Sequence, residues 1–176
     1  MTLRHVSGKL HLVEEIIDEV VGCLRNSLPT KLAELKSQYA DGLDLPAPIP
    51  ECYYTPTNEG PSPLNIAYPA IFVVGGRVSN PPFTEGMHGT GFGGDMDLTY
   101  NVGIFVLCKG ETEVILQKYL YRYSLAVVEV LVQNDSIGIG SCFLDSIDYE
   151  SPQISSQDEL IRDVPIQFII TTNESY

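Results

Sequence analysis

The glycine-rich stretch 89–94 is the part of the sequence whose residue types come closest to a cofactor signature. Its letters, Gly-Thr-Gly-Phe-Gly-Gly, satisfy the G-x-G-x-x-G pattern of dinucleotide-binding loops. That chemistry needs the glycines after a strand and at the start of a helix, where backbone amides meet a pyrophosphate. Here the glycines precede an apolar alternation that begins near Asp97 and predicts a strand. We therefore interpret 89–94 as a hairpin loop and expect no cofactor-binding residues.

A metal site could be assembled only from His88 and the carboxylates near it, Glu85, Asp95 and Asp97. Zinc and other transition metals are bound by histidines and cysteines at defined spacings, and no second histidine lies near His88. The pattern favours acidic side chains that face solvent or a channel, and we expect no metal-binding residues.

The sequence also contains no pattern that supports nucleophilic or acid–base catalysis. The sequence contains neither a G-x-S-x-G elbow nor a P-loop lysine motif. Ser141-Cys142 lies within a predicted strand, and Glu111 and Glu113 open a predicted helix, whose N-terminal dipole favours acids. The four cysteines form no Cys-x-x-Cys pair and are predicted to be buried, reduced thiols: Cys23, Cys52, Cys108 and Cys142. We expect no catalytic residues and predict that the chain is not an enzyme.

Length, composition and charge restrict the other classes. The 176 residues, 44% apolar and 19% charged, predict one folded domain over 1–176. Ten basic and 23 acidic residues give a net charge of −13, which excludes a groove that grips nucleic acid, although a surface that repels DNA stays compatible. No apolar run approaches the roughly 18–20 residues of a membrane span, and residues 1–9 lack a signal peptide's apolar region.

Residues 1–42 predict N-terminal helices. Apolar residues at three- and four-residue steps mark an amphipathic helix over about 11–27, and Pro29 fits the first turn of a second helix that continues to about Tyr39. Six prolines then define an extended connector over 43–68, with a short edge strand near 51–55. A connector of this length is expected to lie over the domain surface or on a neighbouring subunit.

Residues 69–172 predict the sheet and a central helix. Strands are expected over 70–75, 97–108, 137–149 and 160–172, and a helix over 111–133. The helix is apolar nearly all round, so it needs cover both from the sheet and from either the first helix or another subunit. Pro165 predicts an edge position or a bulge. The expected class is α+β: N-terminal helices, then a β-β-α-β-β unit with a mostly antiparallel sheet packed on a long helix.

This order of elements resembles the tail terminator and tail-completion proteins of tailed bacteriophages. The resemblance covers residues 10–28 and 66–172, and the segments that carry it are 68–74 (YPAIFVV), 98–106 (LTYNVGIFV), the helix 111–131 and the strand 161–172. The connector 43–68 is longer than the pattern of that family.

The resemblance implies a structural virion protein that forms a homo-hexameric ring at the head–tail junction, assembled in the host cytoplasm. The ring would cap the tail tube and contact tube subunits, sheath subunits and head-side connector or adaptor proteins. Loops 43–68 and 77–96 would contact neighbouring copies, and DNA would pass through an acidic lumen without specific binding. Two alternatives stay open: another neck component, a head-closure or adaptor protein, or a small ligand-binding domain that uses the glycine-rich loop.

Overall fold

The computed structural model describes residues 13–56, 66–79, 95–133, 141–149, 154–156 and 159–175. Their elements follow in the order α1 (Val13–Tyr39), η1 (Pro50–Cys52), β1 (Tyr53–Tyr54), β2 (Ala70–Ser79), β3 (Asp95–Gly110), α2 (Glu113–Gln133), β4 (Ser141–Ile147), β5 (Ile154–Ser156) and β6 (Glu159–Ser175). The predicted α+β class is confirmed. No helix in these ranges is long and apolar enough to cross a membrane.

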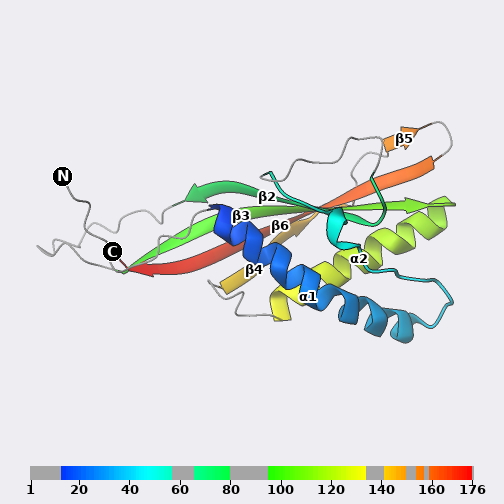
Figure 1. Ribbon diagram of the computed structural model, residues 1–176, viewed down its shortest axis with the longest axis horizontal. Helices are drawn as coiled ribbons and strands as arrows, with labels where there is room; N and C mark the ends of the chain where they lie inside the picture. The colour runs from blue at the N-terminus through cyan, green and yellow to red at the C-terminus, as the bar shows by residue number, and fades with distance from the viewer. Residues whose placement is uncertain are drawn as a thin grey trace, which may run out of the picture.

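The strands form one mixed sheet in the order β1-β2-β3-β6-β4, with β5 paired to β6. Only β1 and β2 are parallel, and the remaining pairs are antiparallel. The longest pair joins β3 to β6 from Asp95 opposite Ser175 to Gly110 opposite Leu160. In Figure 1 these two strands reach beyond the helices on the side where α1 begins.

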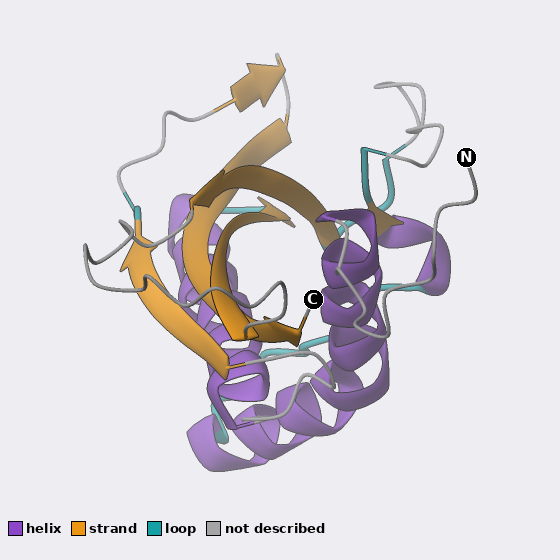
Figure 2. Cartoon of the chain, turned by 90° about the vertical axis from the view of Figure 1, so that its left-hand side faces the viewer, coloured by secondary structure: helices purple, strands orange, loops and turns teal. Residues whose placement is uncertain are grey.

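Both helices cover the same face of the sheet, and alternate strand residues point into the core beneath them. The predicted alternation is confirmed: the buried side chains include Tyr100, Val102, Ile104, Val106 and Cys108 of β3 and Val164, Ile166, Phe168 and Ile170 of β6. Figure 2 views the strands end-on, with the two helices outside the curved sheet. The opposite face has no helix from the described part of the chain.

Helix α2 packs against the sheet on one side and against α1 on another. Its buried residues lie on several sides of the helix and include Leu116, Leu120, Ala126, Val127 and Leu131. This confirms that an almost wholly apolar helix receives cover from two directions, with α1 as the second cover.

The prediction of two N-terminal helices was wrong, because α1 is continuous through Pro29. A proline inside a helix removes one backbone hydrogen bond and disfavours helix by about 3 kcal/mol. The exposed position of Pro29 leaves the packing face intact, and the leucines on both sides of it are buried: Leu24, Leu28, Leu32 and Leu35. Packing against α2 and the sheet therefore overrides the local signal.

The edge position predicted for Pro165 was wrong, because β6 lies inside the sheet between β3 and β4. Pro165 is opposite Phe105 of β3, and its carbonyl accepts a hydrogen bond from the Asp148 amide, just beyond the end of β4. In an antiparallel strand the amide and carbonyl of one residue point to the same side. The side of Pro165 that lacks an N–H donor therefore faces the end of β4. The proline thus removes no backbone hydrogen bond between β6 and β3.

The outermost strands differ in part from the predicted elements. Strand β1 is an edge strand within the predicted segment 51–55, which confirms that prediction. Strand β4 covers the second half of the predicted strand 137–149, and residues 137–140 lie outside the described ranges. The structure also has β1 before β2 and β5 between β4 and β6, so the order of strands along the chain is more complex than the predicted β-β-α-β-β unit.

Gly110 permits the tight passage from β3 into α2. A Cβ atom added there would lie 2.7 Å from both the Cβ and the backbone nitrogen of Leu116. We expect Gly110→Ala to lower the free energy of unfolding by about 1–3 kcal/mol, the typical cost of overpacking, since the neighbouring backbone cannot yield as a side-chain tip would. Urea denaturation measures this.

Gly22→Ala is the matched control, because nothing lies within 4 Å of a Cβ atom at Gly22 inside α1. There we expect a gain of about 0.5–1 kcal/mol from the better helix propensity of alanine. Equal urea midpoints for Gly110→Ala and the wild type would contradict the packing argument.

Candidate assembly surfaces

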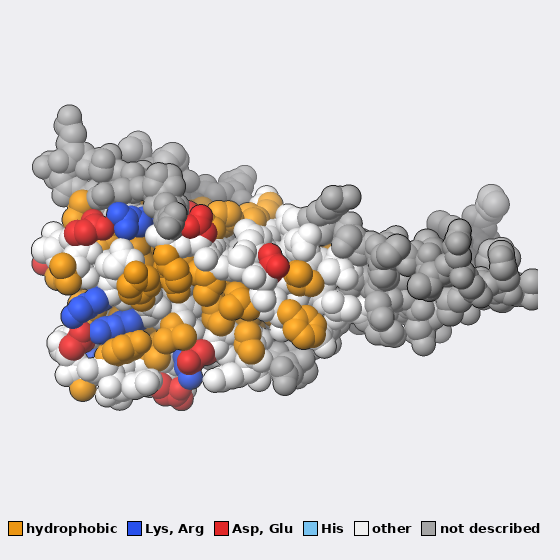
Figure 3. All heavy atoms as spheres, turned by 180° about the vertical axis from the view of Figure 1, so that it is seen from behind, with side chains coloured by type: hydrophobic (Ala, Val, Ile, Leu, Met, Phe, Trp, Pro, Cys, Tyr) orange, Lys and Arg blue, Asp and Glu red, His pale blue; other side chains and the backbone are white. Residues whose placement is uncertain are grey.

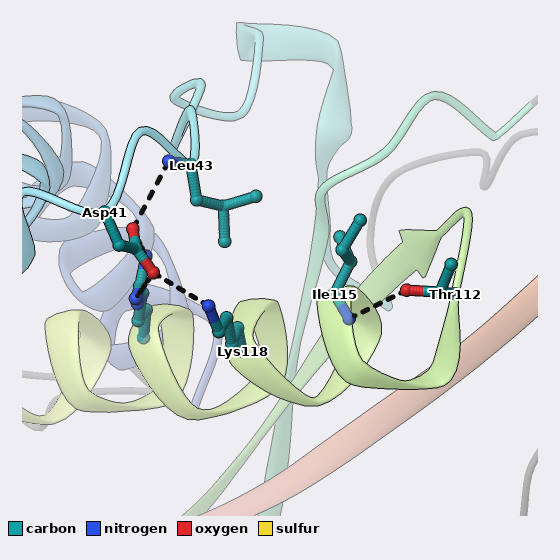
Figure 4. Close-up of polar contacts among 6 residues, drawn as sticks. Asp41, Leu43, Thr112, Ile115 and Lys118 are labelled. Atoms are coloured by element: carbon teal, nitrogen blue, oxygen red, sulfur yellow. Dashed lines mark hydrogen bonds and ion pairs between the residues drawn. The ribbon is translucent and has the colours of Figure 1, made fainter.

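An ion-pair cluster fastens the end of α1 to α2, and it is centred on Asp41. The Arg122 guanidinium donates two hydrogen bonds to the Asp41 carboxylate, at 2.9 and 2.6 Å, and the Lys118 ammonium donates a third at 2.9 Å. The Leu43 amide donates to the same carboxylate at 3.3 Å (Figure 4). Arg122 is buried and also lies 4.2 Å from the centre of the Tyr39 ring. This Asp41 clamp explains how an arginine is buried on an otherwise apolar helix.

The charges of the clamp hold the Asp41 carboxyl in its ionised form. Hydrogen bonds from Arg122, and then from Lys118, lower the pKa of Asp41 well below its ordinary value of 3.8. The same contact raises the pKa of Arg122. The clamp is therefore fully charged at neutral pH.

The connector after α1 is fastened to the helices at two further points. The Tyr123 hydroxyl donates to the Pro46 carbonyl, and the Arg25 guanidinium donates to the Pro50 carbonyl at 3.0 Å. The Cys52 thiol then donates to the Ala67 carbonyl at 3.3 Å, beside β1. The described first part of the connector, residues 43–56, thus lies over its own domain, one of the two predicted positions.

A groove of about 790 Å³ lies where β3 passes into α2. Its walls come from the connector, the end of β3, the first turns of α2 and the start of β6: Leu43, Tyr68, Lys109, Gly110, Glu111, Ile115, Tyr119 and Leu160. Desolvation raises the pKa of Tyr119, so its hydroxyl stays protonated at neutral pH. The Thr112 hydroxyl, which accepts from the Ile115 amide at 3.3 Å, caps α2 beside this groove (Figure 4). The wall is of mixed character, with apolar, hydroxyl and oppositely charged groups.

The sheet face away from the helices carries a row of apolar side chains across three strands. Phe72 of β2 is opposite Phe105 of β3, which is opposite Pro165 of β6. All three are partly exposed. Figure 3 views the molecule from behind Figure 1 and shows apolar side chains gathered across the described part of that side. A partly exposed apolar row of this kind is typical of a contact surface.

Strand β4 places further apolar side chains at the edge of the sheet. Phe143 is 57% exposed and Leu144 is 39% exposed, and they lie on opposite faces of the strand. Phe143 is opposite Ile169, on the face away from the helices. The register with β6 shifts between Leu144 and Ser146, which leaves Asp145 as an exposed bulge residue. On the helix side, Tyr149 packs edge-on against Tyr121, with ring centres 4.9 Å apart.

The structure brings together only part of the residues that the sequence singled out. The loop 89–94, His88 and Glu85 lie outside the described residues. Asp95 and Asp97 open β3, so a strand and not a helix follows the glycines, as predicted. In the described ranges no group of three metal-binding side chains forms. The sequence did not single out Asp41, Phe143 or Leu144, because only the three-dimensional arrangement distinguishes them from other acidic and apolar residues.

The prediction that the cysteines are buried is confirmed for three of the four. Cys52, Cys108 and Cys142 are buried, and Cys23 is half-buried. Burial raises the pKa of the Cys142 thiol to about 12 and also raises that of Cys108 and Cys52. A protonated thiol is a poor nucleophile, so these groups act as packing residues at neutral pH.

The sequence of the chain matches no protein-family model, and no curated protein matches it either.

The Asp41 clamp has a testable pH dependence. Because the folded pKa of Asp41 is depressed, its contribution to stability is complete above 3.8 and is lost as the pH falls below that value. We expect Asp41→Asn to lower the urea midpoint at pH 7, because the buried Arg122 keeps its charge without a counter-ion. The difference from the wild type should shrink below pH 3.8.

Asp44→Asn is the control for this experiment, because Asp44 pairs with Lys36 at 2.6 Å and both side chains are more than half exposed. Exposed pairs contribute little to stability, so this variant should stay close to the wild type. A pH-independent effect of Asp41→Asn would count against the ionic explanation of the clamp.

Proposed function

We propose that the chain is a structural subunit that assembles with copies of itself into a ring, resembling the tail terminators of tailed phages. The ring would cap the tail tube and join it to the head. The observation that carries this proposal is the exposed apolar edge of the sheet, where Phe143 and Leu144 of β4 are 57% and 39% exposed. Large exposed apolar patches on folded proteins typically mark interaction sites.

The order of the main elements supports the same proposal. Strands β2 and β3 precede α2, and β4, β5 and β6 follow it, an order close to the β-β-α-β-β pattern that the resemblance implies. Helix α1 precedes this unit and packs against both β2 and α2. The connector makes the chain longer than the pattern of that family, and its described part contacts α1 through Arg25 and α2 through Tyr123.

The charges of the described residues suit a ring that lets DNA pass. Five basic side chains are neutralised by carboxylates of the same chain: Lys31, Lys36, Lys118, Arg122 and Arg162. Binding to DNA requires cations that are free to replace counter-ions along the phosphates. A net charge of −13 then disfavours attachment of DNA to the surface.

A head-closure or adaptor protein is the second candidate, because such neck components would use the same exposed edge in a ring. The two differ in the neighbour that they contact. A terminator binds purified tail-tube subunits, whereas an adaptor or head-closure protein binds the head-side connector. Pull-down with each purified component separates them.

The proposed ring predicts a specific response to loss of the Phe143 ring. We expect the wild type to form a discrete hexameric species in sedimentation velocity and ring-shaped particles in negative stain. Phe143→Ser should raise the concentration for half-assembly by about tenfold or more, since exposed aromatic side chains dominate interface energies.

Val114→Ser is the matched control, because Val114 is 66% exposed but lies on the first turn of α2, away from β4. It should assemble as the wild type does. A wild-type chain that stays monomeric at all concentrations and does not associate with tail-tube subunits would overturn the proposal.

A further inference from the structure

The two outer strands of the sheet form two different edges. Strand β4 ends the order on one side and β1 ends it on the other. Figure 2, in which the strands are seen end-on, places these edges on opposite sides of the molecule. A contact that joined one edge to the other would therefore use two unlike surfaces of each copy, and such contacts form a ring where the rotation between copies closes.

The directions of the strands are compatible with such a contact. Strand β1 is parallel to β2, β2 and β6 are both antiparallel to β3, and β4 is antiparallel to β6. Strand β4 therefore runs opposite to β1. A rotation about an axis along the strands preserves these directions, so β4 of one copy would meet β1 of the next in the antiparallel sense. Antiparallel pairing is slightly more stable per residue than parallel pairing.

The charges at the two edges are complementary. At the β1 edge, Arg25 of α1 lies 5.3 Å from the centre of the Tyr53 ring and donates to the Pro50 carbonyl. These contacts to a ring and a carbonyl leave the exposed guanidinium without a carboxylate among the described residues. At the β4 edge, Asp145 is exposed on the bulge. Glu51 of η1 is also exposed at the β1 edge, and its carboxylate would repel Asp145. The two copies must therefore be placed so that Asp145 meets Arg25 and not Glu51.

Each edge also carries an exposed apolar side chain. At the β4 edge, Phe143 and Leu144 are 57% and 39% exposed. At the β1 edge, Ile49 precedes η1 and is 52% exposed, whereas Tyr54 of β1 is buried with its ring 4.6 Å from that of Phe72.

From strand direction and charge, together with the exposed apolar side chains at both edges, we propose that the occupant of the β4 edge is the β1 edge of a second copy, with Asp145 of one copy paired to Arg25 of the next. This inference rests on the proposed ring and names the surfaces that close it.

Charge reversal tests the pairing. Sedimentation velocity over a concentration series should show that R25E and D145R each raise the concentration for half-assembly by about tenfold or more, since each replaces an attractive contact with a like-charge one. The double variant R25E/D145R should regain assembly near that of the wild type. An equimolar mixture of the two single variants should also regain it, because the reversed charges then meet their complements at alternating interfaces.

The control D18R changes charge at an exposed position of the same helix and should assemble as the wild type does. Far-ultraviolet circular dichroism and urea midpoints near the wild-type values establish that each variant is folded. Rings that survive both single reversals, or single reversals that neither the double variant nor the mixture rescues, would overturn this pairing and leave the proposed ring in place. A wild type that never assembles would overturn both.

Discussion

The fold depends on enclosing one helix whose surface is apolar almost all the way round. Helix α2 buries side chains against β3, β6 and β4 on one side and against α1 on the other. The connector begins beside α2 at the Asp41 clamp, where Arg122 and Lys118 bind the Asp41 carboxylate. Contacts from Tyr123 of α2 and Arg25 of α1 then hold the connector on its way to β1.

Much of the fold could be predicted because its signals are periodic and long. The alternation along β3 extends over enough residues to show which side chains face the core, and the apolar stripe of α1 does the same at the helical period. The unusual all-round apolarity of α2 also predicted cover on two sides. In each case the pattern and the packing depend on the same property, the burial of apolar area, so agreement between them is expected.

The local signals of proline were less informative, because burial at distant residues outweighs them. Pro29 is a good helix start in isolation, yet leucines on both sides of it pack against the same partners and keep α1 continuous. Pro165 is tolerated inside the sheet because its missing donor faces the point where β4 ends. The candidate surfaces were also not predictable from the sequence. Phe143 and Leu144 are exposed because β4 is an outer strand, and strand order depends on pairing between distant segments.

The place of β6 in the sheet also determines when the sheet can be completed during synthesis. This strand lies between β3 and β4, yet it follows every other described strand along the chain. Until it emerges, β3 lacks one neighbour and β4 has no strand on which to form. Bringing residues 95–110 and 159–175 together closes a loop that includes all of α2, and such long-range pairing is slow compared with helix formation. A nascent chain therefore cannot present β4 in its final position before β6 is made, and the order of translation itself delays every contact that uses this edge.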